Sequence, residues 1–208
     1  MIADVAPRWV VTVLFGLSLA ECLLALVVHR GNWPARVNHT LHLVMSLAMI
    51  LMAWPFGMGL PTFPPMVFFL LAALWFAGLG AVVSTHLRDR LINGYHAVMM
   101  AAMAWMYAVM NGSILSGKAA AAPNHPGMNM PGMDMPATDT AAHSGPPGWI
   151  SAVDWVFVVF FALAAAYWLY RYVAVRRAEG GTGVLQHAGV VCQAFMAAGM
   201  AIAFAVMG

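Results

Sequence analysis

Three apolar segments each carry a histidine or glutamine followed by two methionines at fixed spacing. The three copies read His42-x2-Met45-x3-Met49, His96-x2-Met99-x3-Met103 and Gln193-x2-Met196-x3-Met200. Steps of three and four residues keep side chains on one face of an α-helix, so each segment is predicted to present one stripe of metal ligands. Thioethers prefer soft ions, and the stripes therefore indicate copper(I) as the cofactor or cargo.

The composition of the chain indicates that these stripes lie in a membrane. Of the 208 residues, 63% are hydrophobic and 8% are charged, and the mean hydropathy is +0.82. Soluble domains carry roughly 25% charged residues, and a run of about 20 apolar residues is enough to cross a bilayer. Six runs predict six transmembrane helices, at 9–28, 37–56, 66–84, 91–115, 149–170 and 184–206.

The arginines predict the orientation of these helices. Seven of the nine Lys and Arg lie in the connections after the first, third and fifth runs. Loops rich in Lys and Arg stay in the cytoplasm, so both termini and the loop at 116–148 should lie outside. We expect a multi-pass protein of the plasma membrane, in contact with lipid, whose helices form three hairpins of the same orientation.

The hairpins also read as internal copies of one another. A shift of 54 residues places the first phrase on the second and Met52 on Met106, and a further shift of 97 reaches the third. The third copy differs from the others, because Gln193 replaces the histidine and Ala203 replaces the outer methionine. The repeat predicts an all-α bundle with pseudo-threefold symmetry, with hairpins at 1–58, 62–115 and 149–208 and a flexible external loop at 116–148.

In this bundle the second helix of each hairpin lines the axis, and the ligands form layers. The outer layer is Met49, Met103 and Met200, the next is Met45, Met99 and Met196, and the layer nearest the cytoplasm is His42, His96 and Gln193. Packing is the competing interpretation of the methionines, because this residue fills gaps between helices. Ionisable residues within a membrane are costly and usually functional, which favours a polar site at the histidines.

The loop at 116–148 carries a second set of soft ligands. Its small and polar composition cannot bury a core, so methionines there have no packing role. The spacing Met-x-Met-x2-Met-x-Met would let a flexible strand gather thioethers around copper(I). The predicted loop ligands are His125, Met128, Met130, Met133, Met135 and His143.

Other reactive residues occur in or near the apolar runs. Glu21 is at a depth that could match the membrane histidines, so it is a candidate for the same site, with a structural hydrogen bond as the alternative. Cys22 and Cys192 belong to no C-x2-C motif and are expected to pack, with metal ligation as their alternative role. Solvated or interfacial positions are expected for His29, His39, His86 and His187.

The methionine motif of the loop resembles the motifs of periplasmic copper-resistance proteins and of Ctr-type copper transporters. Ctr transporters also use a Met-x3-Met pair on one helix of each of three subunits, to which the three methionine pairs of this chain are similar. Over nearly its whole length, the chain resembles an actinobacterial multi-pass membrane family of unassigned function. That resemblance implies the fold type, and the local similarity implies copper(I).

These patterns predict a copper-handling membrane protein and favour binding over catalysis. The loop would capture copper(I), and the bundle would store it, pass it inward or deliver it to a cuproenzyme. One alternative is a metal-free structural or assembly subunit of a larger membrane complex. Another is a metal- or haem-dependent membrane oxidoreductase that uses His42 and His96 as ligands. The sequence lacks a phosphate-binding loop, and its net charge of +2 gives no indication of nucleic-acid binding.

Overall fold

The computed structural model describes residues 5–28, 33–55, 61–112, 148–178 and 188–207. All regular structure in these ranges is helical, which confirms the all-α prediction. The elements are α1 (Val5–Val28), α2 (Trp33–Ala53), α3 (Phe63–Gly78), the π-helical turn η2 (Leu79–Val83), α4 (Leu87–Asn111), α5 (Gly148–Ala178) and α6 (Ala188–Met207).

Four of the described helices are long and apolar enough to cross a bilayer: α1, α3 with η2, α5 and α6. They expose large apolar side chains to their surroundings, among them Leu24, Leu74 and Leu163. Such surfaces are stable against lipid and unfavourable in water. The helices therefore fit a membrane protein, whereas crossing by α2 and α4, which begin with polar turns, stays a prediction.

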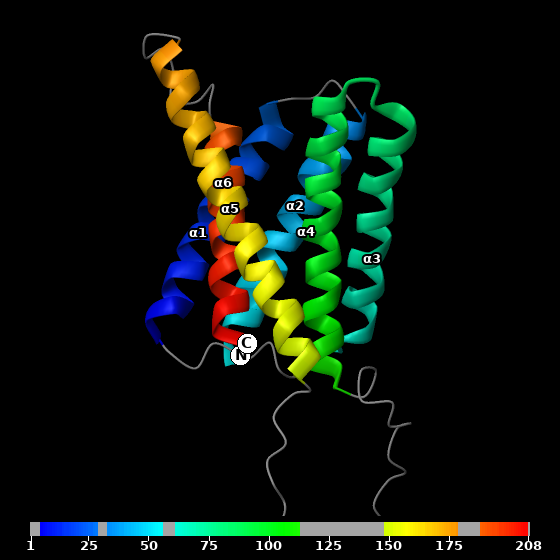
Figure 1. Cartoon of the computed structure of the whole chain (residues 1–208), viewed down its shortest axis with the longest axis vertical. Helices are drawn as coiled ribbons and strands as arrows, with labels where there is room; N and C mark the ends of the chain where they lie inside the picture. Colours follow the sequence, from blue (N-terminus) through cyan, green and yellow to red (C-terminus); the bar gives the residue numbers. More distant parts are fainter. Residues whose placement is uncertain (1–4, 29–32, 56–60, 113–147, 179–187, 208) are drawn as a thin grey trace, which may run out of the picture.

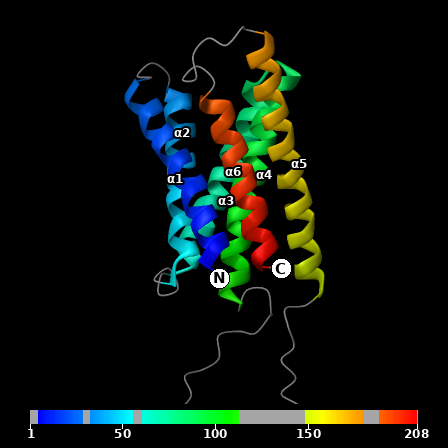
Figure 2. The same cartoon turned by 90° about the vertical axis from the view of Figure 1, so that its left-hand side faces the viewer.

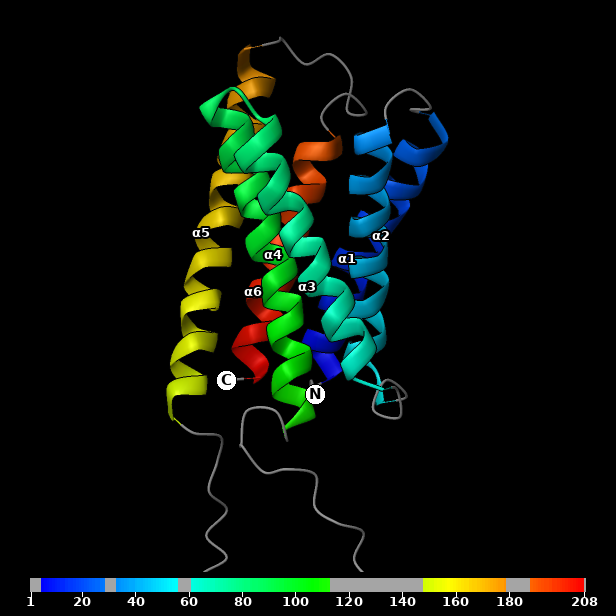
Figure 3. The same cartoon turned by 90° about the vertical axis from the view of Figure 1, so that its right-hand side faces the viewer.

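The helices run alternately up and down the long axis of the bundle (Figure 1). Helix α1 packs on α2 and α6, α3 packs on α4, and α5 packs on α6. In both side views, α5 lies at one edge and the α1–α2 pair at the opposite edge, with α4 and α6 between them (Figures 2 and 3).

This alternation gives the bundle two chemically different ends. Val5, Ala53, Asn111 and Met207 lie at one end, which we call the terminal end (Figure 1). We call the opposite end the arginine end, because it carries Arg36, Arg88, Arg90, Arg171, Arg176 and Arg177.

The core is built largely from α2, α4 and α6. All six methionines of the repeated phrases are buried in one continuous cluster, and they are Met45, Met49, Met99, Met103, Met196 and Met200. The helical spacing noted in the sequence explains this burial, since each stripe occupies one face of its helix. The outer surface of the bundle is formed largely by the exposed apolar side chains of α1, α3 and α5.

Gly199 sets the distance between α1 and α6. A Cβ atom at this position would lie 2.6 Å from a ring carbon of Phe15, which is itself fully buried. Glycine leaves room for this close approach without a shift of the ring or of the helices. Two helical turns farther along both antiparallel helices, the same approach brings Cys22 next to Cys192.

Buried polar contacts join the helices at the terminal end. Trp105 Nε1 of α4 donates a 2.8 Å hydrogen bond to Asp154 Oδ1 of α5, and Asp154 is buried. Trp54 Nε1 donates to Thr12 Oγ1 at 3.3 Å, which connects the end of α2 to α1. These bonds fix the helix ends, because an unpaired buried polar group is costly.

Candidate metal centre

A cavity of about 210 Å³ lies between α1, α2, α4 and α6, toward the arginine end. We call it the polar cavity, because side chains with carboxyl, thiol, imidazole, amide and thioether groups line it. These side chains are Glu21, Cys22, Asn38, His39, His42, His96, Cys192, Gln193 and Met196. The predicted layer of two histidines and one glutamine is thus brought to one cavity, and Glu21 lies there too.

Glu21, Cys22 and Cys192 form the tightest group of ligand atoms. One carboxylate oxygen and the two Sγ atoms all lie within 4.8 Å of one another. Two sulfurs bound to one ion at about 2.3 Å in tetrahedral geometry are about 3.8 Å apart. The three atoms can therefore converge on a single ion after small side-chain movements.

Both thiols of this group are buried and unbridged. The Cys192 thiol donates a long, weak hydrogen bond to the backbone oxygen of Ser18 at 3.9 Å. His39 lies beside the Cys22 thiol and lines the same cavity, outside this group of three. Two thiols, a carboxylate and an imidazole are the donor set of tetrahedral thiolate metal sites.

His42 and His96 meet across the boundary between α2 and α4. Their ring centroids are 4.6 Å apart and their planes are inclined by 76°. Only 4% of His42 and 8% of His96 is exposed. Phe76 of α3 contacts both rings, with centroid distances of 5.6 and 5.2 Å, and closes the site on that side.

The hydrogen bonds of these histidines leave ring nitrogens available. His42 Nδ1 is 2.7 Å from the backbone oxygen of Asn38, and because a carbonyl only accepts, Nδ1 carries the hydrogen. A neutral His42 then presents a lone pair at Nε2. Within the described residues, His42 Nε2, both nitrogens of His96 and Gln193 Oε1 have no hydrogen-bond partner. Metal-binding histidines show this pattern, with one nitrogen fixed by a carbonyl and the other facing the ion.

The methionine stripes extend from the polar cavity toward the terminal end. Met196 lines the cavity, whereas Met45 and Met99 follow their histidines by one turn and are fully buried. From His42 to Met49 the rise along α2 is about 10 Å. A column of buried thioethers therefore begins at the imidazoles and leads away from the arginine end.

The cysteines are the candidate ligands that sequence reasoning undervalued. They lie on α1 and α6, far apart in the chain and outside any ligand motif, so their proximity depends on how these helices pack. His39 was likewise expected near the interface, yet it faces Cys22. The one available signal was the Glu21-Cys22 pair inside an apolar helix, since a carboxylate there needs a partner.

The predicted loop ligands lie outside the described residues. These are His125, Met128, Met130, Met133, Met135 and His143, and His187 is also outside.

The fold and the polar cavity define a class: helical proteins with membrane-type apolar surfaces and a partly buried cluster of sulfur, imidazole and carboxylate side chains. The chain belongs to the DUF5134 family, described as a domain of unknown function, whose model matches residues 34–207. It is 47% identical to the uncharacterized proteins Mb0995 of Mycobacterium bovis and Rv0970 and MT0998 of Mycobacterium tuberculosis. Each alignment covers 100% of this chain and 98% of the relative. No solved structure matches the chain.

These comparisons confirm the expected membership of an actinobacterial family of unassigned function.

Proposed function

We propose that this protein is a copper(I)-handling protein of the plasma membrane. In this proposal six helices cross the bilayer as three repeated hairpins, with the termini outside and the arginine end in the cytoplasm. The packing of α1 on α2, α3 on α4 and α5 on α6 supports the hairpins. Helices α2 and α4 run beside the apolar α1 and α3 (Figure 1), so a bilayer that covers α1 and α3 would enclose them as well.

The observation that carries the proposal is the ligand set of the polar cavity. Two thiols and a carboxylate lie within 4.8 Å of one another, beside His42 and His96, and three of the four ring nitrogens of these histidines are buried without a hydrogen-bond partner among the described residues. An unpaired buried polar group costs about 1–3 kcal/mol, and such a cost is usually retained for function. A metal ion would recover it by accepting the free lone pairs.

The softness and charge of the ligands favour copper(I) over a divalent ion. Met196 and the thiols are soft donors, which select copper(I). One thiolate is enough to neutralise a monovalent ion when the second thiol and the Glu21 carboxyl keep their protons, because imidazole and thioether bind as neutral ligands. A neutral complex is favourable here, because uncompensated charge in an apolar bundle is costly.

In the proposed cycle, the external loop captures copper(I) and the buried thioethers connect it to the polar cavity. The ion then either enters the cytoplasm, remains stored or passes to a cuproenzyme or another membrane-complex subunit. These uses have different consequences in cells. Replacing Met45, Met99 and Met196 by Ala would lower copper accumulation if the ion is translocated, and would lower only cuproenzyme activity if it is delivered.

The geometry favours this proposal over a haem protein. His42 and His96 are in direct ring contact, and Phe76 fills the adjacent space. A porphyrin between two axial histidines would need to separate these rings. A metal ion beside them needs no such separation.

The test is copper(I) binding by the purified full-length protein under anaerobic conditions, in competition with a chromophoric chelator. Met128, Met130, Met133 and Met135 are first replaced by Leu to silence the loop. We expect the Cys22→Ser/Cys192→Ser variant to bind copper(I) at least about tenfold more weakly. Loss of a residue that only orients a metal ligand already lowers metal affinity by about tenfold or more, so loss of two direct ligands should cost at least as much.

Met100→Leu is the matched control. Met100 is a fully buried sulfur residue of α4 that lines none of the cavities described. The Met100→Leu variant should bind copper(I) like the parent. If the cysteine variant also binds like the parent, the polar cavity is not the copper site, and if the parent itself binds none, a metal-free structural role is favoured.

A further inference from the structure

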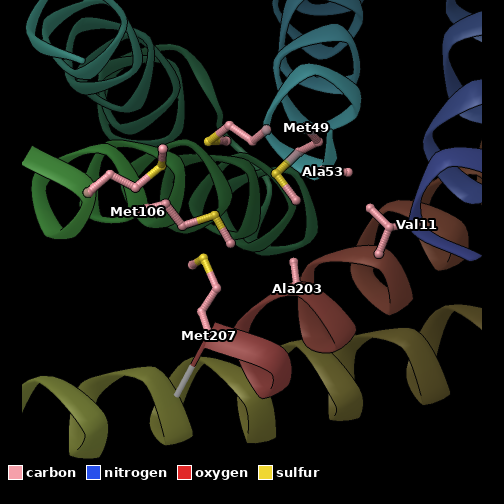
Figure 4. A pocket seen from close by; sticks show the side chains of 8 residues that line it. Val11, Met49, Ala53, Met106, Ala203 and Met207 are labelled. Atoms are coloured by element: carbon pink, nitrogen blue, oxygen red, sulfur yellow. The ribbon is translucent and has the colours of Figure 1, made fainter. Parts of the chain in front are cut away.

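A second cavity, of about 30 Å³, lies at the terminal end of the bundle (Figure 4). We call it the methionine cavity, because five of its eight lining residues are methionines. They come from three helices: Met49 and Met52 of α2, Met106 and Met110 of α4, and Met207 of α6.

We propose that the methionine cavity is a separate binding site for a soft monovalent ion, copper(I) or silver(I), built from thioethers alone. Only Met49 among its methionines belongs to the repeated phrases. This inference rests on the proposed function in taking copper(I) as the natural ion. It concerns a different site, whose ligands and pH dependence differ from those of the polar cavity.

The position of the thioethers supports a site at which an ion enters. Met106 is 1% exposed and Met110 is 36% exposed, while Met52 and Met207 are half-buried. The methionines therefore lead from the surface of the terminal end into the core. Met49 then connects this cavity to the buried thioethers that extend to the polar cavity.

The third helix supplies its thioether from an unexpected position. In the repeat, Met52 of α2 and Met106 of α4 correspond to Ala203 of α6, which has no sulfur. Met207 lies one turn farther along the same face of α6. Both Ala203 and Met207 line the cavity, and the small alanine leaves room for the longer side chain (Figure 4). Each of the three helices thus contributes a thioether despite the imperfect repeat.

The lining of the cavity defines what it can hold. Its other walls are Val11, Ala53 and Ala203, so it has no hydrogen-bonding side chain. A cavity of this size accommodates about one water-sized particle, but a stable water needs two to four polar partners. Zinc(II) and copper(II) prefer nitrogen, oxygen or thiolate ligands, whereas neutral thioethers suit copper(I) and silver(I).

Removal of the thiols separates the two cavities experimentally. Thiols bind silver(I) strongly, so Cys22→Ser and Cys192→Ser together remove the strongest ligands of the polar cavity. Thioethers carry no proton to lose. Silver(I) held by the methionine cavity should therefore remain bound in this background, also at about pH 5.

The experiment is equilibrium dialysis against silver(I), followed by metal analysis, and its parent is the full-length, loop-silenced protein that also carries Cys22→Ser and Cys192→Ser. At about pH 5 we expect the parent to hold about one equivalent, and the Met52→Leu/Met106→Leu/Met207→Leu variant to lose most of it. Leucine matches methionine in volume, and such exchanges usually cost less than about 1.5 kcal/mol, so the variant should fold. Thermal unfolding checks that it does.

A Met66→Leu/Met100→Leu variant is the control, because neither residue lines either cavity. Silver(I) retained at low pH by the triple variant, or lost equally by the control, would overturn the methionine site. In that case, binding at neutral pH that depends on Cys22 and Cys192 would leave the proposed function standing. Absence of silver(I) binding at both pH values, also in the protein that retains Cys22 and Cys192, would refute both.

Discussion

The contact between Gly199 and Phe15 gives a quantitative test of how the fold positions the metal ligands. A Cβ atom at Gly199 would lie 2.6 Å from Phe15, and ordinary contact begins at 3.4 Å. In the Gly199→Ala variant, the ring or the helices must therefore move by about 0.8 Å, and forced overpacking of this kind costs about 1–3 kcal/mol. We expect a lower unfolding temperature of the protein in detergent.

The same substitution should weaken copper(I) binding, although Gly199 lies about two turns from the cavity. Moving α6 away from α1 separates Cys192 from Glu21 and Cys22, whose ligand atoms now lie within 4.8 Å. Chelator competition measures this loss. Gly16→Ala is the control, because a Cβ atom at Gly16 would meet nothing within 4 Å.

A compensating change distinguishes this mechanism from general damage. Replacing Phe15 with the smaller leucine in the Gly199→Ala background removes the ring that the new methyl group strikes. The double variant should recover stability and copper(I) affinity toward the level of Phe15→Leu alone. The proposed helix register would be refuted if the double variant recovered neither stability nor copper(I) affinity. It would also be refuted if the Gly199→Ala variant behaved like the parent.

Two further predictions address the buried polar groups. His96→Leu should leave the unfolding temperature of the metal-free protein unchanged or higher, because it removes two unpaired buried nitrogens. The same substitution should lower the affinity for copper(I). If it also lowers the unfolding temperature of the metal-free protein, His96 has a structural role instead. Trp105→Phe should destabilise the protein by about 1.5–3 kcal/mol, because it removes the hydrogen bond to buried Asp154, and chemical unfolding measures this change. The Trp105→Phe/Asp154→Ala pair checks the coupling, because alanine removes the acceptor and additive effects of the two substitutions would show that the bond contributes little.

Several features of the fold follow from local sequence. Apolar runs long enough to cross a bilayer must form helices there, because lipid offers no partners to the backbone. The described helices coincide with the predicted runs, although α5 continues to Ala178, beyond the predicted end at 170. Its last turns carry Arg176 and Arg177. These residues lie beyond the apolar run that hydropathy predicts, yet they are still helical.

Burial of the methionine stripes was also readable from spacing. His42, Met45 and Met49 share one face because of the helical period, and all three are buried. Periodicity identifies which side chains of one helix lie together. It carries no information about which neighbouring helix they meet.

Which helices contact one another was decided by the tertiary structure alone. Cys22 and Cys192 belong to no motif, and they become neighbours because Gly199 lets α6 approach Phe15 of α1. Met207 likewise supplies a thioether that the repeat lacks at Ala203, because the side chains fill space in three dimensions. The sequence by itself determined the helices, their buried faces and the soft character of their candidate ligands, since these depend on local composition and period. Only the packing of α1, α2, α4 and α6 decided which of these side chains share a cavity, since that depends on the shapes of side chains far apart in the chain.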